Sequence, residues 1–260
     1  MEEIFLKNNI YKICTYFIIY SIAGFIIETI FGIVTTGLFE SRKSFLYGPF
    51  CGIYGVGAVA IIVFSKYFNK NNFTLFLGGY AIGTVTEYMI SYLVETFLHT
   101  QWWNYTGRIL NINGRVCLLY SIFWGILTVF LVKKVNPYID KIIKKAIEKC
   151  GTKAFKIIIL SISIFLIIDI LLTCYAQNQF ITRMVVEHNI EVENFEKRLS
   201  EYDKTKQNEK LSNIIEKYWN NTKMIKAFPN MKIEDKNNKT IYMDSLLPDI
   251  QSYYIKVFTR

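Results

Sequence analysis

Five long apolar stretches, separated by short polar segments, dominate the first two thirds of the sequence. Uncharged runs cover residues 13–27, 44–65, 71–86, 116–132 and 157–168, and three of them continue past a single acid, Glu28, Glu87 or Asp169. A helix needs about 20 mostly apolar residues to cross a hydrocarbon core of roughly 30 Å. The pattern predicts an all-α fold, a polytopic membrane helix bundle with about five spans at residues 11–35, 47–65, 73–98, 116–132 and 157–176.

The segment between the last two spans is amphipathic. In residues 137–150 one helix face is apolar, and lysines flank it or lie opposite; the apolar positions are Tyr138, Ile139, Ile142, Ile143, Ala146, Ile147 and Cys150. This pattern is typical of a surface helix that lies on an anionic leaflet. We therefore assign residues 1–176 to a transmembrane domain that includes this surface helix.

The remaining residues, 177–260, form a polar tail. Its apolar positions step by four and three residues, which is a heptad spacing: Ile181, Val185, His188, Val192, Phe195, Leu199 and Tyr202. Such spacing favours a helical, partly coiled-coil-like tail that packs on itself or on a second copy of the chain. His188 lies on this seam, so a packing role is favoured over a catalytic one.

Composition and charge agree with a membrane protein. Hydrophobic residues make up 52% of the chain, and the mean hydropathy is +0.24. The formal charge of +9 is concentrated, because residues 133–156 hold eight lysines and only two acids. Cytoplasmic loops carry the excess of lysine and arginine. We therefore predict a cytoplasmic N-terminus, an extracytoplasmic tail, the lipid bilayer as a partner, and no nucleic acid.

Motifs for soluble catalysis are missing from the sequence. It contains no GxxxxGK[ST] loop, no HExxH, no GxSxG and no CxxC among its five cysteines. We therefore predict no catalytic residues, no cofactor and no metal site. An enzyme that uses an intramembrane acid stays open, but it is the less favoured class.

Glycines recur at helical spacing along the predicted spans. Gly24, Glu28 and Gly32 are four residues apart and share one face of the first span. Glycines on such a face allow two helix backbones to approach closely. The candidate packing positions are Gly24, Gly32, Gly48, Gly52, Gly55, Gly79 and Gly83.

Acids inside the apolar stretches indicate a polar site within the membrane domain. A carboxylate at membrane depth costs about 2.5 to 3.5 kcal/mol on insertion scales, so it is expected to face protein or water. The predicted outer loops supply arginines, aromatics and amides that could meet these acids. We predict a chamber open to the outer side and lined by Glu28, Arg42, Tyr47, Glu87, Glu95, Trp103, Asn104, Tyr105, Arg108, Asn111, Asn113, Arg115 and Asp169.

Several of these segments carry a resemblance. The segments GFIIETIFG (24–32), SRKSFLYGPFCGIYGVGA (41–58), TEY (86–88), WWNYTGRILNINGRVCLLYSIFWG (102–125) and IDILL (168–172) resemble the Putative ABC-transporter type IV membrane family of low-GC bacteria. The family usually has aspartate where this chain has Asn104, so no role that needs a charge there carries over. The resemblance implies a permease-like protein of the bacterial inner membrane.

Two functions stay open from the sequence. The first is an ABC-transporter permease-like component that moves or presents a small solute or lipid, lacks its own ATPase and pairs with a separate ATPase subunit. Five spans are few for a complete pathway, so this function also predicts a homo-oligomer. The second is a non-transport membrane protein, such as an envelope sensor or assembly factor whose outer tail binds partners.

Overall fold

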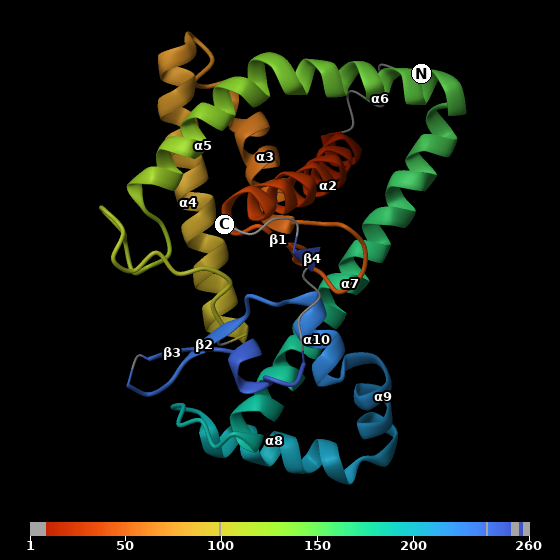
Figure 1. Ribbon diagram of the computed structural model, residues 1–260. Helices are drawn as coiled ribbons and strands as arrows, with labels where there is room; N and C mark the ends of the chain where they lie inside the picture. The colour runs from red at the N-terminus through yellow and green to blue at the C-terminus, as the bar shows by residue number, and fades with distance from the viewer. Residues whose placement is uncertain (1–8, 99, 238, 251–254, 257–260) are drawn as a thin grey trace. The chain divides into compact units, whose positions relative to one another are not determined.

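The computed structural model describes residues 9–98, 100–237, 239–250 and 255–256. It is mostly helical (Figure 1). The helices of the membrane domain are α2 (Asn9–Thr36), α3 (Gly52–Ser65), α4 (Asn72–Leu98), α5 (Leu118–Phe130), α6 (Asn136–Cys150) and α7 (Thr152–Glu187). The first two thirds of the chain are therefore mostly helical, as the apolar pattern predicts, with longer connections between α2 and α3 and between α4 and α5.

Among the described residues, three helical stretches are long and apolar enough to cross a membrane: Ile10–Thr36, Leu118–Cys150 and Thr152–Glu187. The predicted number of five spans is therefore not shown. The predicted span at 47–65 corresponds to α3, whose 14 residues reach only about 21 Å at 1.5 Å per residue. The predicted span at 73–98 corresponds to α4, which is long enough but contains polar positions throughout. These two spans stay predictions.

The surface of α7 is apolar on the side that does not contact the protein. Six large side chains there are between 45% and 66% exposed: Ile157, Leu160, Ile164, Phe165, Ile167 and Leu171. The opposite side is buried through Phe155, Ile159, Leu166, Asp169 and Thr173. An apolar exposed face on a helix of this length is expected where lipid replaces water as the solvent.

A π-helix joins α5 to α6. It covers Leu131–Val135, and no loop separates the predicted span at 116–132 from the predicted surface helix at 137–150. The helix axis bends at this point (Figure 1), as is common at π-helical turns. In α6 only Ile143 and Ile147 are fully buried, and all four of its lysines are exposed. The lysine-rich face of α6 is thus exposed rather than packed against the protein.

The tail folds around the last turns of α7. Beyond it come α8 (Phe195–Gln207), α9 (Glu209–Trp219) and α10 (Asn221–Ala227), which gather about the end of α7 (Figure 1). A hydrophobic core joins them; its fully buried members include Phe180, Ile181, Met184, Val185, Ile215, Met224, Ile225, Met231, Ile233 and Met243. The tail helices therefore share one hydrophobic core with the last turns of α7, and Leu46 and Leu172 pack against it.

The heptad seam predicted over residues 181–202 does not form one helix. Helix α7 ends at Glu187 and α8 begins at Phe195, with Asn189 between them in the left-handed region at φ 50°. The chain turns back here, so Ile181 and Val185 enter the globular core. Non-local burial of these side chains outweighs the local coiled-coil spacing.

The structure adds four short strands to the all-helical prediction. Strand β1 (Leu38–Phe39) pairs antiparallel with β4 (Ile255–Lys256), and β2 (Lys232–Glu234) pairs antiparallel with β3 (Thr240–Tyr242). A short 3₁₀-helix covers Asp244–Leu246. Two loops of the membrane domain contact the tail: Asn230 Nδ2 donates to Glu40 Oε1 at 3.3 Å, and the Thr100 hydroxyl donates to the Lys232 carbonyl at 2.7 Å. The tail thus packs against these two loops.

The chain divides into two compact units. The first contains the residues up to Phe25 together with Pro49–Ile90 and Asn104–Ile168. The second contains Ile26–Gly48, Ser91–Trp103 and the residues from Asp169 onward. The boundaries fall inside α2, α4 and α7, so each of these helices contributes to both units. The predicted division at residue 176 stays a prediction.

Candidate functional site

Glycines bring α2 and α3 into close contact within the first unit. A Cβ atom added at Gly24 would lie 2.3 Å from Cβ of Tyr54 on α3. In return, a Cβ at Gly55 would lie 2.1 Å from Oγ of Ser21 and 2.9 Å from the carbonyl oxygen of Phe17, both on α2. No side chain fits at either position, so the two helices pack with their backbones near each other.

Glycines also allow α4 and α5 to pack closely. A Cβ at Gly79 would lie 2.1 Å from Oγ1 of Thr128, and a Cβ at Gly83 would lie 2.3 Å from Cγ of Trp124. Gly79, Gly83 and Glu87 are all buried and four residues apart. The carboxylate of Glu87 therefore lies on the same face of α4 that packs against α5.

The other glycines singled out from the sequence have different surroundings. A Cβ at Gly32 would lie 2.9 Å from Nε of Arg42, a loop side chain. Gly48 is exposed and has φ 77°, so it serves a turn. Gly52 is buried and begins α3.

Glu87 meets the loop that follows α4. It is 4% exposed, and its Oε1 accepts a hydrogen bond of 2.9 Å from the Tyr105 hydroxyl. The Tyr105 ring stacks on Tyr120 of α5, with ring centroids 4.7 Å apart. Burial and then the Glu87 carboxylate raise the pKa of Tyr105 well above its usual value. The Tyr105 hydroxyl therefore remains protonated and can donate to Glu87 over the physiological pH range.

The loop that carries Tyr105 is held in shape by its own backbone and amide groups. The Tyr105 N–H donates to the Gly114 carbonyl at 2.7 Å, and Asn111 Oδ1 accepts from the Gly114 N–H at 3.2 Å. Gly114 has φ 66°, and a Cβ there would lie 2.8 Å from Oδ1 of Asn104. Asn104 Oδ1 accepts from the Thr106 N–H at 2.8 Å. Asn104 and Asn111 thus brace the loop that places Tyr105.

Tyr88, one residue beyond Glu87, meets the far end of this loop. Asn113 Nδ2 donates to the Tyr88 hydroxyl at 2.9 Å, and Cζ of Arg115 lies 5.4 Å from the centre of the Tyr88 ring. Arg108 is exposed on the same loop. Two consecutive side chains of α4, Glu87 and Tyr88, thus anchor the loop at different points.

Asp169 forms a comparable site in the second unit. It is 1% exposed on α7, and its two carboxylate oxygens accept from the Tyr47 N–H at 3.3 and 3.2 Å. Thr173, one turn later, donates its hydroxyl to Asp169 Oδ1 at 3.2 Å and accepts from the Leu46 N–H at 2.9 Å. Two consecutive backbone amides of the loop before α3 are therefore fixed to α7.

The loop before α3 also carries two basic residues, Lys43 and Arg42. Lys43 Nζ donates to the Leu46 carbonyl at 2.6 Å. Burial lowers the pKa of Lys43 below its usual value, and the Asp169 carboxylate opposes that shift. Arg42 forms an ion pair with Glu40. Tyr47 contributes its backbone to Asp169, while its side chain is 43% exposed.

The predicted chamber residues therefore fall into two groups. Glu87, Asn104, Tyr105, Arg108, Asn111, Asn113 and Arg115 belong to the first unit, and Glu28, Arg42, Tyr47, Glu95, Trp103 and Asp169 belong to the second. Within each unit the structure joins a buried acid of a long helix to a loop, Glu87 of α4 in the first unit and Asp169 of α7 in the second. Glu28, Glu95 and Trp103 are half-buried. A single chamber stays a prediction.

Some polar contacts were not predicted from the sequence. The first is the contact of Thr173 with Asp169. Thr173 lies four residues after Asp169 on the same helix face, and this spacing could have predicted the contact. A second is the contact of α2 with α6, where the Tyr16 hydroxyl donates to Asp140 and the Tyr20 hydroxyl donates to Asn136 Oδ1 at 3.0 Å. No spacing rule links side chains more than a hundred residues apart. Within the described ranges, no cluster of histidine, cysteine or acidic side chains could hold a metal ion.

Comparison with known proteins gives one match. The family model described as Putative ABC-transporter type IV matches residues 15–174. This segment contains Glu87, Tyr105, Asp169 and Thr173, and it ends before the tail domain. Neither the curated proteins nor the solved structures gave a match.

Proposed function

Because this chain belongs to the Putative ABC-transporter type IV family, we propose that it is a permease-like membrane component of an ABC-type transport assembly. It moves or presents a small solute or a lipid. The sequence has no GxxxxGK[ST] loop to cradle ATP phosphates. In this proposal a separate ATPase subunit supplies the energy, and the chain works as a homo-oligomer in the bacterial inner membrane.

One observation carries the proposal: two membrane-helix acids are buried and each is fixed to a loop. Glu87 receives the Tyr105 hydroxyl, and Asp169 receives the Tyr47 N–H and the Thr173 hydroxyl. Intramembrane acids are expensive and commonly mark solute or ion pathways. Here both lie in the segment that the family model matches, which supports a role in the family's shared activity.

The ATPase is tested by purification from the native host. The tagged full-length protein is extracted into lipid discs, and proteins and small molecules that co-purify are identified by mass spectrometry. A stoichiometric ATPase supports the transport proposal. If no ATPase appears and a specific lipid or envelope protein does, the non-transport alternative replaces it.

Orientation is a further part of the proposal, with the N-terminus and α6 cytoplasmic and the tail outside. Cys150 is exposed at the end of α6, so it serves as a natural probe. A membrane-impermeant maleimide should label Cys150 only after the cells are permeabilised. In a variant with Ser245→Cys, the tail should be labelled in intact cells. Labelling of Cys150 in intact cells would show that the orientation is the opposite of the proposed one.

A further inference from the structure

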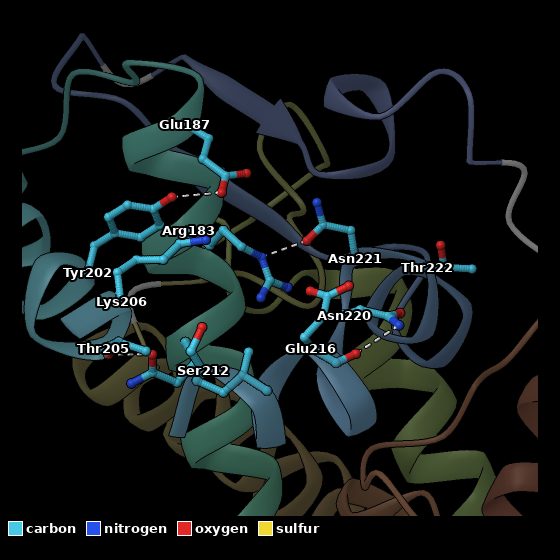
Figure 2. A pocket seen from close by; sticks show the side chains of 12 residues that line it. Arg183, Glu187, Tyr202, Thr205, Lys206, Ser212, Glu216, Asn220, Asn221 and Thr222 are labelled. Carbon is cyan, nitrogen blue, oxygen red and sulfur yellow. Dashed lines mark hydrogen bonds between the residues drawn. The ribbon is translucent and has the colours of Figure 1, made fainter. Parts of the chain in front are cut away.

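A polar pocket lies in the tail domain, outside the segment that the family model matches. It has a volume of about 270 Å³ and is lined by side chains of α7, α8, α9 and α10, together with Asn220 just before α10. Figure 2 shows these side chains around the pocket. All of them belong to the second compact unit. The predicted span at 157–176 ends before Gln179, the first residue of α7 in the lining, so the pocket opens to water in the predicted topology.

The guanidinium group of Arg183 is fixed at the pocket. Its Nε donates to Asn221 Oδ1 at 2.6 Å, and Nη2 donates to the Trp219 carbonyl at 3.0 Å (Figure 2). Its Cζ also lies 5.7 Å from the centre of the Phe180 ring. A guanidinium group has five N–H donors. Two are used here, so donors remain for a ligand while the group is already oriented.

Charges of both signs face this pocket, and the Glu187 and Glu216 carboxylates attract the Arg183 guanidinium without a direct contact. Arg183 and Lys206 line it together with Glu187 and Glu216, so the four charges sum to zero. Within the described part of the chain, none of these four side chains forms an ion pair. Glu187 accepts a 2.9 Å hydrogen bond from the Tyr202 hydroxyl. The carboxylate of Glu216 accepts no hydrogen bond from any described residue.

We propose that this pocket binds a small zwitterion of amino-acid size. The carboxylate of the ligand would bind Arg183 and Lys206, since planar guanidinium groups suit carboxylates. The ammonium group of the ligand would bind Glu216. A volume of about 270 Å³ lies just below the roughly 300–1,000 Å³ typical of small-molecule sites, which matches a ligand of this size. Hydroxyl and amide groups from Thr205, Ser212 and Asn220 complete a lining that suits a polar ligand.

Binding is tested on the full-length protein in lipid discs by isothermal titration calorimetry with each of the twenty amino acids. The expected result is saturable binding of a subset. For a bound amino acid, its N-acetyl derivative and its amide, which each lack one charge, should bind at least tenfold more weakly. The variant Glu216→Gln should weaken binding by a similar factor, and its fold is checked by circular dichroism because the Glu216 carboxylate also attracts the Arg183 guanidinium.

The matched control is Glu193→Gln, an exposed glutamate outside the pocket, which should bind as the wild type does. Arg183→Gln should remove binding, with its fold checked by circular dichroism. The proposal is wrong if no amino acid binds, or if Glu216→Gln and Glu193→Gln bind equally well. Neither outcome bears on the ATPase, so this test is independent of the transport proposal.

Discussion

Replacing Thr173 with valine should destabilise the protein by removing one hydroxyl group. Thr173 is 3% exposed, and its hydroxyl accepts from the Leu46 N–H at 2.9 Å and donates to Asp169 Oδ1 at 3.2 Å. Valine has nearly the same shape, so the variant leaves packing almost unchanged. It removes the hydroxyl that accepts from the Leu46 N–H at 2.9 Å, so this N–H keeps only the Asp169 carboxylate nearby, and Asp169 has one donor fewer.

The expected cost follows from these two losses. Removing the closest acceptor of a buried N–H costs about 1–3 kcal/mol, and loss of a hydrogen bond to a carboxyl group adds roughly 1 kcal/mol. Together they predict a loss of about 2–4 kcal/mol in the free energy of unfolding. Thr173→Ser keeps the hydroxyl and loses only a methyl group, so it should lie about 1 kcal/mol below the wild type.

The assay is equilibrium unfolding in mixed micelles, followed by fluorescence of the four tryptophans. Thr35→Val is the matched control, because Thr35 is exposed on α2 and its hydroxyl donates only to carbonyls of its own helix, Phe31 and Gly32. It should change the free energy by less than about 0.5 kcal/mol. Equal effects of Thr173→Val and Thr35→Val would refute the assigned role of the Thr173 hydroxyl.

Three further changes test other parts of the structure by the same unfolding assay. Tyr105→Phe removes the donor to buried Glu87 and should cost about 1–3 kcal/mol. Gly79→Val places a side chain where a Cβ alone would lie 2.1 Å from Thr128, and it should cost more than about 2 kcal/mol by forcing α4 from α5. Lys232→Met concerns pH: burial lowers the pKa of Lys232 below its usual 10.5. The Lys232 ammonium group therefore holds its proton more tightly in the unfolded wild type than in the folded one. The free energy of unfolding of the wild type should rise with pH just below 10.5, whereas the variant should lack this rise.

Each of these changes has a control. Tyr88→Phe removes a hydroxyl that accepts from exposed Asn113 and should cost less than Tyr105→Phe. Val85→Leu alters an exposed position of α4 and should be neutral. Lys239→Met alters an exposed lysine and should keep the wild-type pH dependence. A Lys232→Met curve parallel to that of the wild type, or a neutral Gly79→Val, would contradict the corresponding argument.

The membrane domain could be predicted from the sequence further than the tail could. Runs of apolar residues specify where helices form, and the ends of α2, α4 and α6 lie within a few residues of the predicted limits. The tail follows weaker signals. Its heptad spacing is genuine, but Val192 and Phe195 lie across a turn from Val185 because burial in a shared core decides the chain's path. The short strands depend on pairing between distant segments, which no local pattern encodes.

The candidate site shows the same limit. Glu87, Tyr105 and Asp169 could be named because an acid in an apolar run, or an aromatic in a polar loop, stands out from its neighbours. Their partners could not be assigned, since the backbone N–H of Tyr47 leaves no mark in the sequence. The pocket around Arg183 was not predicted for a related reason: its four charges come from three separate helices, α7, α8 and α9, and no local spacing links them.

The two buried acids accept hydrogen bonds from different kinds of donor. An acid at membrane depth costs about 2.5–3.5 kcal/mol, and each hydrogen bond to a charged group returns about 1.5–3 kcal/mol. Asp169 accepts from a backbone N–H and a threonine hydroxyl, so its burial is nearly offset while the loop before α3 stays in place. Glu87 is met by the side chain of Tyr105, whose position depends on a loop braced by Asn104, Asn111 and Gly114. If that loop moves, the buried carboxylate loses its tyrosine, whereas Asp169 keeps Thr173 of its own helix. Movement of the loop before α3 would likewise remove the Tyr47 N–H from Asp169, so each site links the energy of a buried acid to the position of a loop.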